Sequence, residues 1–199
     1  MTRFRRPVAL TTQVAGPEYA DEVPGRRAEL AEELASALLS VGRRDPAAAL
    51  ARADELGLVG LAEAWRGADA ISTAGLLWAL HLLRSWCTFR GREAARLYRD
   101  GRVLVPVEDA VAGVPDAPLA ADLAGVGEAL LLTAYAGELG AAAERAAALL
   151  RVVALGRCEA AQALPAAAAT VEHRQAARAS ATAERFAEVA RAWRAGHLH

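Results

Sequence analysis

The pattern of hydrophobic and polar positions along this chain predicts helices almost throughout. Alanine and leucine dominate, and the clusters of β-branched residues that mark strands are nearly absent. Proline, glycine and capping residues divide the chain into segments of helical length. We therefore expect an all-α fold, a single-domain helical bundle of roughly six to eight helices. The expected helices cover residues 24–41, 46–56, 58–66, 71–89, 92–99, 118–139, 141–155 and 165–195, with 164 as an alternative end for the seventh.

Two parts of the chain do not follow this helical pattern. Residues 1–23 are interrupted by polar residues and proline, and we expect an extended N-terminal arm ahead of a helical domain over 24–199. We expect residues from about 100 to 117 to form an irregular connection. Its stretch 103–107 has the composition of an extended segment, but the proline within it argues against a central strand.

The most apolar segment is residues 71–89, ISTAGLLWALHLLRSWCTF, which we expect to be the central helix. Only His81 and Arg84 among its nineteen residues readily carry charge. The segment approaches the length of a membrane span, but an arginine near its middle would cost about 3 kcal/mol in a bilayer. We therefore expect a buried helix of a soluble protein, with no membrane partner.

Polar groups in a core helix need partners, which makes His81 and Arg84 candidate functional residues. Glu128, in the other strongly apolar helix, is an available counter-charge. In a functional interpretation, Arg84 binds a carboxylate or phosphate and His81 transfers a proton. In the structural alternative, which we favour, Arg84 pairs with Glu128 or Glu93 beside a histidine that is hydrogen-bonded to a backbone carbonyl.

Arginines and tryptophans supply the other candidate sites. Arg92, Arg96 and Arg99 recur at helical spacing and form a basic stripe that could contact phosphates. Nearby acidic residues dilute the stripe, so we do not expect nucleic acid as a partner. Trp65 and Trp193 lie near predicted helix ends, where each either anchors an interface or closes one end of the core. Alanine-rich helices bury little area each, which favours pairing with a second copy, most simply as a homodimer.

Composition limits the location and partners of this protein. All 23 basic residues are arginine and lysine is absent, a bias typical of a GC-rich genome. The formal net charge of −1 provides no overall attraction to nucleic acid or to an anionic membrane. The two cysteines, Cys87 and Cys158, lack the spacing of a metal or redox motif. We expect a cytoplasmic protein.

Two short segments are the most distinctive features of the sequence. They are Arg5-Arg6-Pro7 in the arm and residues 192–196, AWRAG, at the other end. In overall texture the chain resembles small helical proteins of high-GC actinobacteria. The resemblance implies a bacterial cytoplasmic protein and carries over no activity or site.

No pattern in the chain completes a catalytic, cofactor or metal motif, so we expect none of these. The sequence therefore favours a non-catalytic helical module that acts as a homo-oligomer and interacts with another protein or a regulatory ligand. One alternative is an anionic small-molecule binding protein or enzyme built around His81, Arg84 and Glu128. The other is nucleic-acid binding through the basic stripe.

Overall fold

The computed structural model describes residues 24–105 and 120–198 of the 199-residue chain. These residues form α-helices and no strand, so the prediction of an all-α fold is confirmed. The predicted arm and positions 106–119 lie outside the described residues. The helices are α1 (Pro24–Gly42), α2 (Pro46–Ala64), α3 (Thr73–Phe89), α4 (Gly91–Arg102), α5 (Ala120–Tyr135), α6 (Leu139–Gln162) and α7 (Ala166–Arg194).

The predicted start signals act at the beginning of α2 and α3. Asp45 caps α2, because its side chain accepts a hydrogen bond from the backbone N–H of Ala48 at 3.0 Å. Ser72 is the N-cap of α3, and its hydroxyl accepts a hydrogen bond from the N–H of Gly75 at 3.1 Å. Proline at the first position of α2 suits the helix, since its missing N–H would have no partner there.

Two glycines with positive φ set where the chain changes direction. Gly57 (φ 66°) kinks α2, so the predicted break between 46–56 and 58–66 is present inside a single helical segment. Gly137 (φ 97°) lies between α5 and α6. The prediction of a helix continuing from 118 to 139 was wrong at this end, because α5 stops at Tyr135 and Leu139 begins α6.

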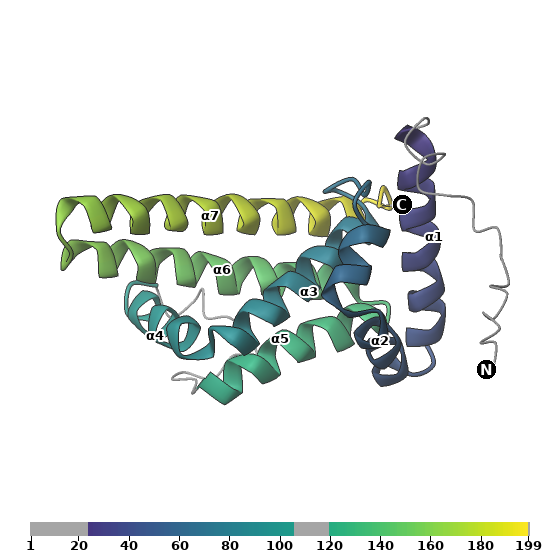
Figure 1. Cartoon of the computed structure of the whole chain (residues 1–199), viewed down its shortest axis with the longest axis horizontal. Helices are drawn as coiled ribbons and strands as arrows, with labels where there is room; N and C mark the ends of the chain where they lie inside the picture. The colour runs from purple at the N-terminus through teal and green to yellow at the C-terminus, as the bar shows by residue number, and fades with distance from the viewer. Residues whose placement is uncertain (1–23, 106–119, 199) are drawn as a thin grey trace, which may run out of the picture.

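α6 and α7 form the longest element pair of the molecule. They lie side by side as an antiparallel pair along its longest axis (Figure 1). α4 packs on α6, α3 packs on α5, and α1 packs on α2. Because α7 packs mainly on α6, much of its other side is exposed.

The core is built mainly from leucine and alanine, so several helices approach closely. α4 and α6 cross where Gly101 faces the backbone carbonyl of Val152 and Gly156 faces that of Leu97. A side chain at either glycine would overlap the opposing backbone. No helix in the described ranges is long and apolar enough to cross a membrane.

Candidate functional site

His81 of α3 lies in a buried aromatic cluster. Its ring centroid is 5.9 Å from that of Trp65 and 6.1 Å from that of Tyr135, and Trp78 extends the cluster beyond Trp65. The side chain of His81 is only 3% exposed, and its Nε2 lies 2.8 Å from the hydroxyl of Tyr135. The partner of His81 Nε2 is therefore the phenol of Tyr135 on α5, and not the backbone carbonyl that we expected.

Burial keeps His81 neutral at physiological pH. Desolvation lowers its pKa from 6.5 to about 4; the charge of Asp54 opposes this shift and the charge of Arg84 adds to it. Desolvation likewise raises the pKa of Tyr135. Both groups stay uncharged near pH 7, which does not favour the predicted role of His81 as a proton-transfer group.

Arg84 is held by a carboxylate that the sequence analysis did not single out. Its Nη1 and Nη2 donate to the two carboxylate oxygens of Asp54 on α2, at 2.6 and 3.1 Å. This hydrogen bonding raises the pKa of Arg84. Glu128 of α5 lies farther away, with its Oε2 3.9 Å from Nη2. The second predicted partner, Glu93, pairs elsewhere.

Arg84, Asp54 and His81 line a hollow of about 430 Å³ between α2 and α3, which we call the α2–α3 hollow; Glu128 is not part of its lining. Two of the three residues predicted to form a pocket, His81 and Arg84, share this hollow with Asp54; that they bind a ligand stays a prediction. Asp54 and Glu128 place two negative charges beside the single positive charge of Arg84. An anionic ligand at Arg84 would therefore meet local negative charge, which argues against the predicted anion site at this position.

A second hollow, the α3–α7 groove, lies on another face of α3 and has a volume of about 500 Å³. This volume falls within the range of about 300–1,000 Å³ that is usual for small-molecule sites. The groove combines walls from α3 and α7 with a floor from α6. Its apolar lining includes Trp78, Leu82 and Trp86 of α3, Leu150 and Val153 of α6, and Phe186 of α7.

The α7 side of the groove also carries positive charge. Arg178, Thr182 and Arg185 recur at helical spacing along its wall. In the described part of the chain, no carboxylate forms an ion pair with Arg178 or Arg185. A long contact of 3.4 Å joins Arg185 to the hydroxyl of Thr182. The groove thus combines apolar walls with two guanidinium groups that have no carboxylate partner within residues 24–105 and 120–198.

No protein-family model, curated protein or solved structure matches this chain. The resemblance to actinobacterial proteins therefore stays a prediction. Over residues 24–105 and 120–198, no group of three or more His, Cys, Asp or Glu side chains could hold a metal ion. Function must be inferred from the chemistry of the two hollows.

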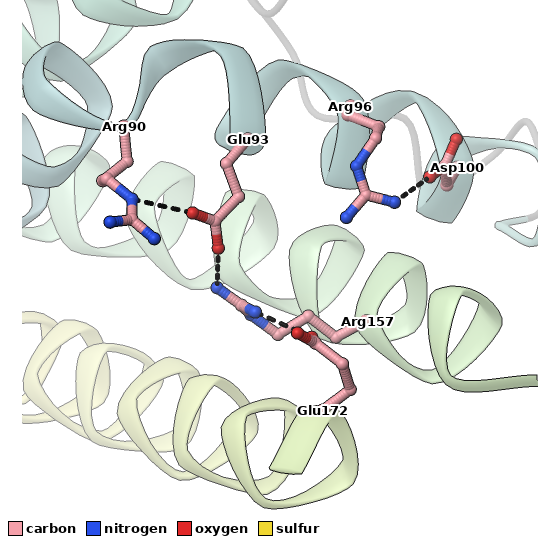
Figure 2. A network of polar contacts seen from close by, with 6 residues as sticks. All are labelled: Arg90, Glu93, Arg96, Asp100, Arg157 and Glu172. Atoms are coloured by element: carbon pink, nitrogen blue, oxygen red, sulfur yellow. Dashed lines mark hydrogen bonds and ion pairs between the residues drawn. The ribbon is translucent and has the colours of Figure 1, made fainter. Parts of the chain in front are cut away.

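Arg157 of α6 ties α4 and α7 together at the edge of the groove. Its guanidinium donates to Glu93 of α4 at 2.9 Å and to Glu172 of α7 at 2.8 Å (Figure 2). Arg90 donates to the second oxygen of Glu93 at 2.8 Å. Burial by itself would raise the pKa of Glu93, but the hydrogen bonds from Arg90 and Arg157 outweigh it, and the net pKa is lowered. Glu93 therefore belongs to an interhelical network rather than to Arg84.

This network leads to a prediction about stability. Arg157→Met should lower the free energy of unfolding by about 1–3 kcal/mol, because the Arg157 side chain is only 11% exposed and its loss leaves two carboxylates without their shared partner. Thermal and urea unfolding would measure the change. Arg151→Met, which removes an exposed pair with Glu184, is the matched control and should cost less than 1 kcal/mol. Equal effects of the two substitutions would contradict a structural role for the network.

The predicted basic stripe lies on the exposed face of α4. Arg92, Arg96 and Arg99 are all exposed there. Arg96 pairs with Asp100 at 3.4 Å (Figure 2), and the Nε of Arg99 donates to the carbonyl of Ala95 at 3.3 Å. The carboxylate of Asp100 within the stripe reduces its positive charge.

The two tryptophans predicted as interface anchors lie in different environments. Trp65 is buried, and its indole N–H donates to the carbonyl of Ala31 at 3.2 Å. It therefore fits the alternative interpretation, that it closes one end of the core, and it offers no surface to a partner. Trp193 is 39% exposed and packs against Gly140 at the start of α6. Of the pair, Trp193 remains available to a partner.

Sequence reasoning missed Asp54, Tyr135, Arg178 and Arg185. Asp54 lies in a charged, amphipathic segment that is typical of a solvated helix face. Arg178 and Arg185 are seven residues apart and so share a helix face, a signal that was available but weak in a chain with 23 arginines. Asp54 and Tyr135 contact α3 across helices, and Arg178 and Arg185 line a groove between helices, so tertiary packing places all four.

Proposed function

We propose that this protein is a non-catalytic ligand-binding module with a regulatory role, which holds an amphipathic anion in the α3–α7 groove. The observation that carries the proposal is that Arg178 and Arg185 line an apolar groove without a carboxylate partner among the described residues. Guanidinium groups bind carboxylates and phosphates through charge-assisted hydrogen bonds. A bound anion would supply the counter-charge that Arg178 and Arg185 do not have among the described residues.

The rest of the groove defines the body of the ligand. Trp78, Trp86 and Phe186 offer aromatic surfaces, and the aliphatic floor belongs to α6. Burying an alkyl or aromatic group there is favourable by about 25 cal/mol per Å² of apolar surface. The ligand class is therefore a carboxylate or phosphate that carries an alkyl chain or an aromatic group.

We further propose that the module works as a homo-oligomer in the cytoplasm. The alanine-rich helices bury little apolar area each, so pairing of two copies would add to it. Trp193, half-exposed near the end of α7, is the residue that supports such an interface. The free cysteines, Cys87 and Cys158, support a reducing compartment. Native mass spectrometry tests the oligomer, and a monomer at micromolar concentration would contradict it.

Binding of decanoate, a carboxylate with a ten-carbon chain, tests the groove. We expect isothermal titration calorimetry to detect decanoate binding to the full chain. The Arg178→Ala/Arg185→Ala variant should bind decanoate at least tenfold more weakly, since a hydrogen bond to a charged group contributes about 1.5–3 kcal/mol.

The control is Arg92→Ala/Arg96→Ala on α4, which removes the same charge at a distance from the groove. It should bind decanoate as the unmodified protein does. If both double variants lose affinity for decanoate equally, the protein attracts the anion through its positive side chains in general and the groove is not the site. If neither changes, the two α7 arginines do not bind the anion.

A further inference from the structure

The α2–α3 hollow has walls suited to a small apolar group. The kink at Gly57 separates the two halves of α2 beside it, and Leu58 and Leu61 line it from the second half. Phe89, at the end of α3, also lines the hollow and is 78% exposed. An aromatic ring this exposed at the mouth of a hollow provides an unused contact surface for an apolar or cationic group.

The acidic groups distinguish this hollow from the groove: Asp54 lines it, and Glu128 lies beside Arg84 without lining it. Asp54 and Glu128 are both about half-exposed, and Arg84 supplies the only guanidinium that contacts them in the described chain. A carboxylate can accept about four hydrogen bonds, and Arg84 uses two on Asp54. Asp54 therefore retains both accepting capacity and access to solvent, which suits a cationic donor.

A third feature is the second nitrogen of the His81 ring. Nε2 contacts the Tyr135 hydroxyl, whereas Nδ1 has no hydrogen-bond partner among the described residues. The side chain is more than nine-tenths buried and lines the hollow. A neutral imidazole that donates from Nε2 to the Tyr135 oxygen presents Nδ1 as an acceptor. In that tautomer of His81, the hollow offers Nδ1 as an acceptor together with the carboxylate oxygens of Asp54.

We propose that the α2–α3 hollow is a second ligand site, which binds a primary amine carrying a small apolar group. The ammonium group donates to Asp54 and to Nδ1 of His81, and the apolar group packs on Leu58 and Phe89. A small molecule fits better than a docked helix, because one of the two acceptors belongs to a side chain that a bulky partner could not reach. The site is independent of the anion groove on the other face of α3.

Phenethylamine and phenylacetate test this site, because both carry a phenyl group and a two-carbon unit but have opposite charges. We expect calorimetry at pH 7.5 to show phenethylamine binding at least tenfold more tightly than phenylacetate to the same hollow. Asp54→Asn and Phe89→Ala should each weaken phenethylamine binding at least fivefold. Both side chains are exposed, so the variants should fold, which circular dichroism checks.

The controls remove a similar group elsewhere: Asp100→Asn on α4 and Val59→Ala on the exposed side of α2 should leave amine binding unchanged. The Arg178→Ala/Arg185→Ala variant should also bind phenethylamine normally, which separates this site from the groove. Three results would overturn the proposal. The first is that phenethylamine does not bind at millimolar concentration. The second is that its binding is unchanged in both Asp54→Asn and Phe89→Ala. The third is that phenylacetate binds at least as tightly as the amine and loses this binding in Arg84→Met.

Discussion

Gly101→Ala and Gly156→Ala are each expected to lower the free energy of unfolding by about 3 kcal/mol. At both positions a methyl group would overlap a backbone carbonyl of the facing helix, that of Val152 or that of Leu97. A flexible side chain could move aside, but a helical backbone cannot, so α4 and α6 would have to separate and lose their packing. Urea unfolding followed by circular dichroism measures the change.

Gly125→Ala in α5 is the matched control. A Cβ atom at Gly125 meets nothing within 4 Å, so alanine should stabilise the helix by about 0.5–1 kcal/mol through its higher helix propensity. Comparing Gly125→Ala with the other two variants separates the steric overlap from the general effect of replacing glycine with alanine. If Gly101→Ala and Gly156→Ala were as stable as the unmodified protein, the close crossing of α4 and α6 would be wrong.

Lowering the pH from 6.5 to 4 is expected to reduce stability by about 3 kcal/mol through His81 alone. Its pKa is about 4 in the folded chain and 6.5 when exposed, so the unfolded chain takes up the proton first. The contribution of neutral His81 to the free energy of unfolding is fully present above pH 6.5, declines below pH 6.5, and is lost near pH 4. Carboxylates such as Glu93, whose pKa is lowered in the folded chain, reduce the free energy of unfolding further at the acid end of this range and below it.

His81→Gln tests this assignment, since glutamine can still hydrogen-bond Tyr135 but does not titrate. The variant should show a flatter dependence of unfolding free energy on pH between 4 and 6.5. NMR titration of the His81 ring gives a second readout, with an expected midpoint near pH 4. A midpoint near 6.5, or the same pH slope in the variant, would show that His81 does not carry the effect.

The helices could be predicted from the sequence because their signals are local. Asp45 and Ser72 cap helices through contacts three residues away, and the glycine at 57 changes the backbone at its own position. Where local signals were ambiguous, the prediction failed. We expected one helix over 118–139, but α5 ends at Tyr135 and Gly137 adopts a positive φ.

The polar partners could not be predicted, because they join helices that are distant in sequence. Arg84 is 30 residues from Asp54, and His81 is 54 residues from Tyr135. Glu128 was a reasonable partner for Arg84 by residue type, but the packing of α2 brings Asp54 closer. Likewise Glu93 forms an ion pair with Arg157, 64 residues away in the sequence, and not with Arg84 of the neighbouring helix α3.

The sequence by itself determined the helical class, most helix boundaries and the polar pair His81 and Arg84 on one apolar helix, because propensity, capping and periodicity act over a few residues. The tertiary structure alone decided which charges are neutralised. It pairs Arg84 with Asp54 and leaves Arg178 and Arg185 at the α3–α7 groove without a carboxylate in the described chain. The interaction between two charges weakens with their separation and with solvent screening, so the charge around each hollow depends on how the helices pack.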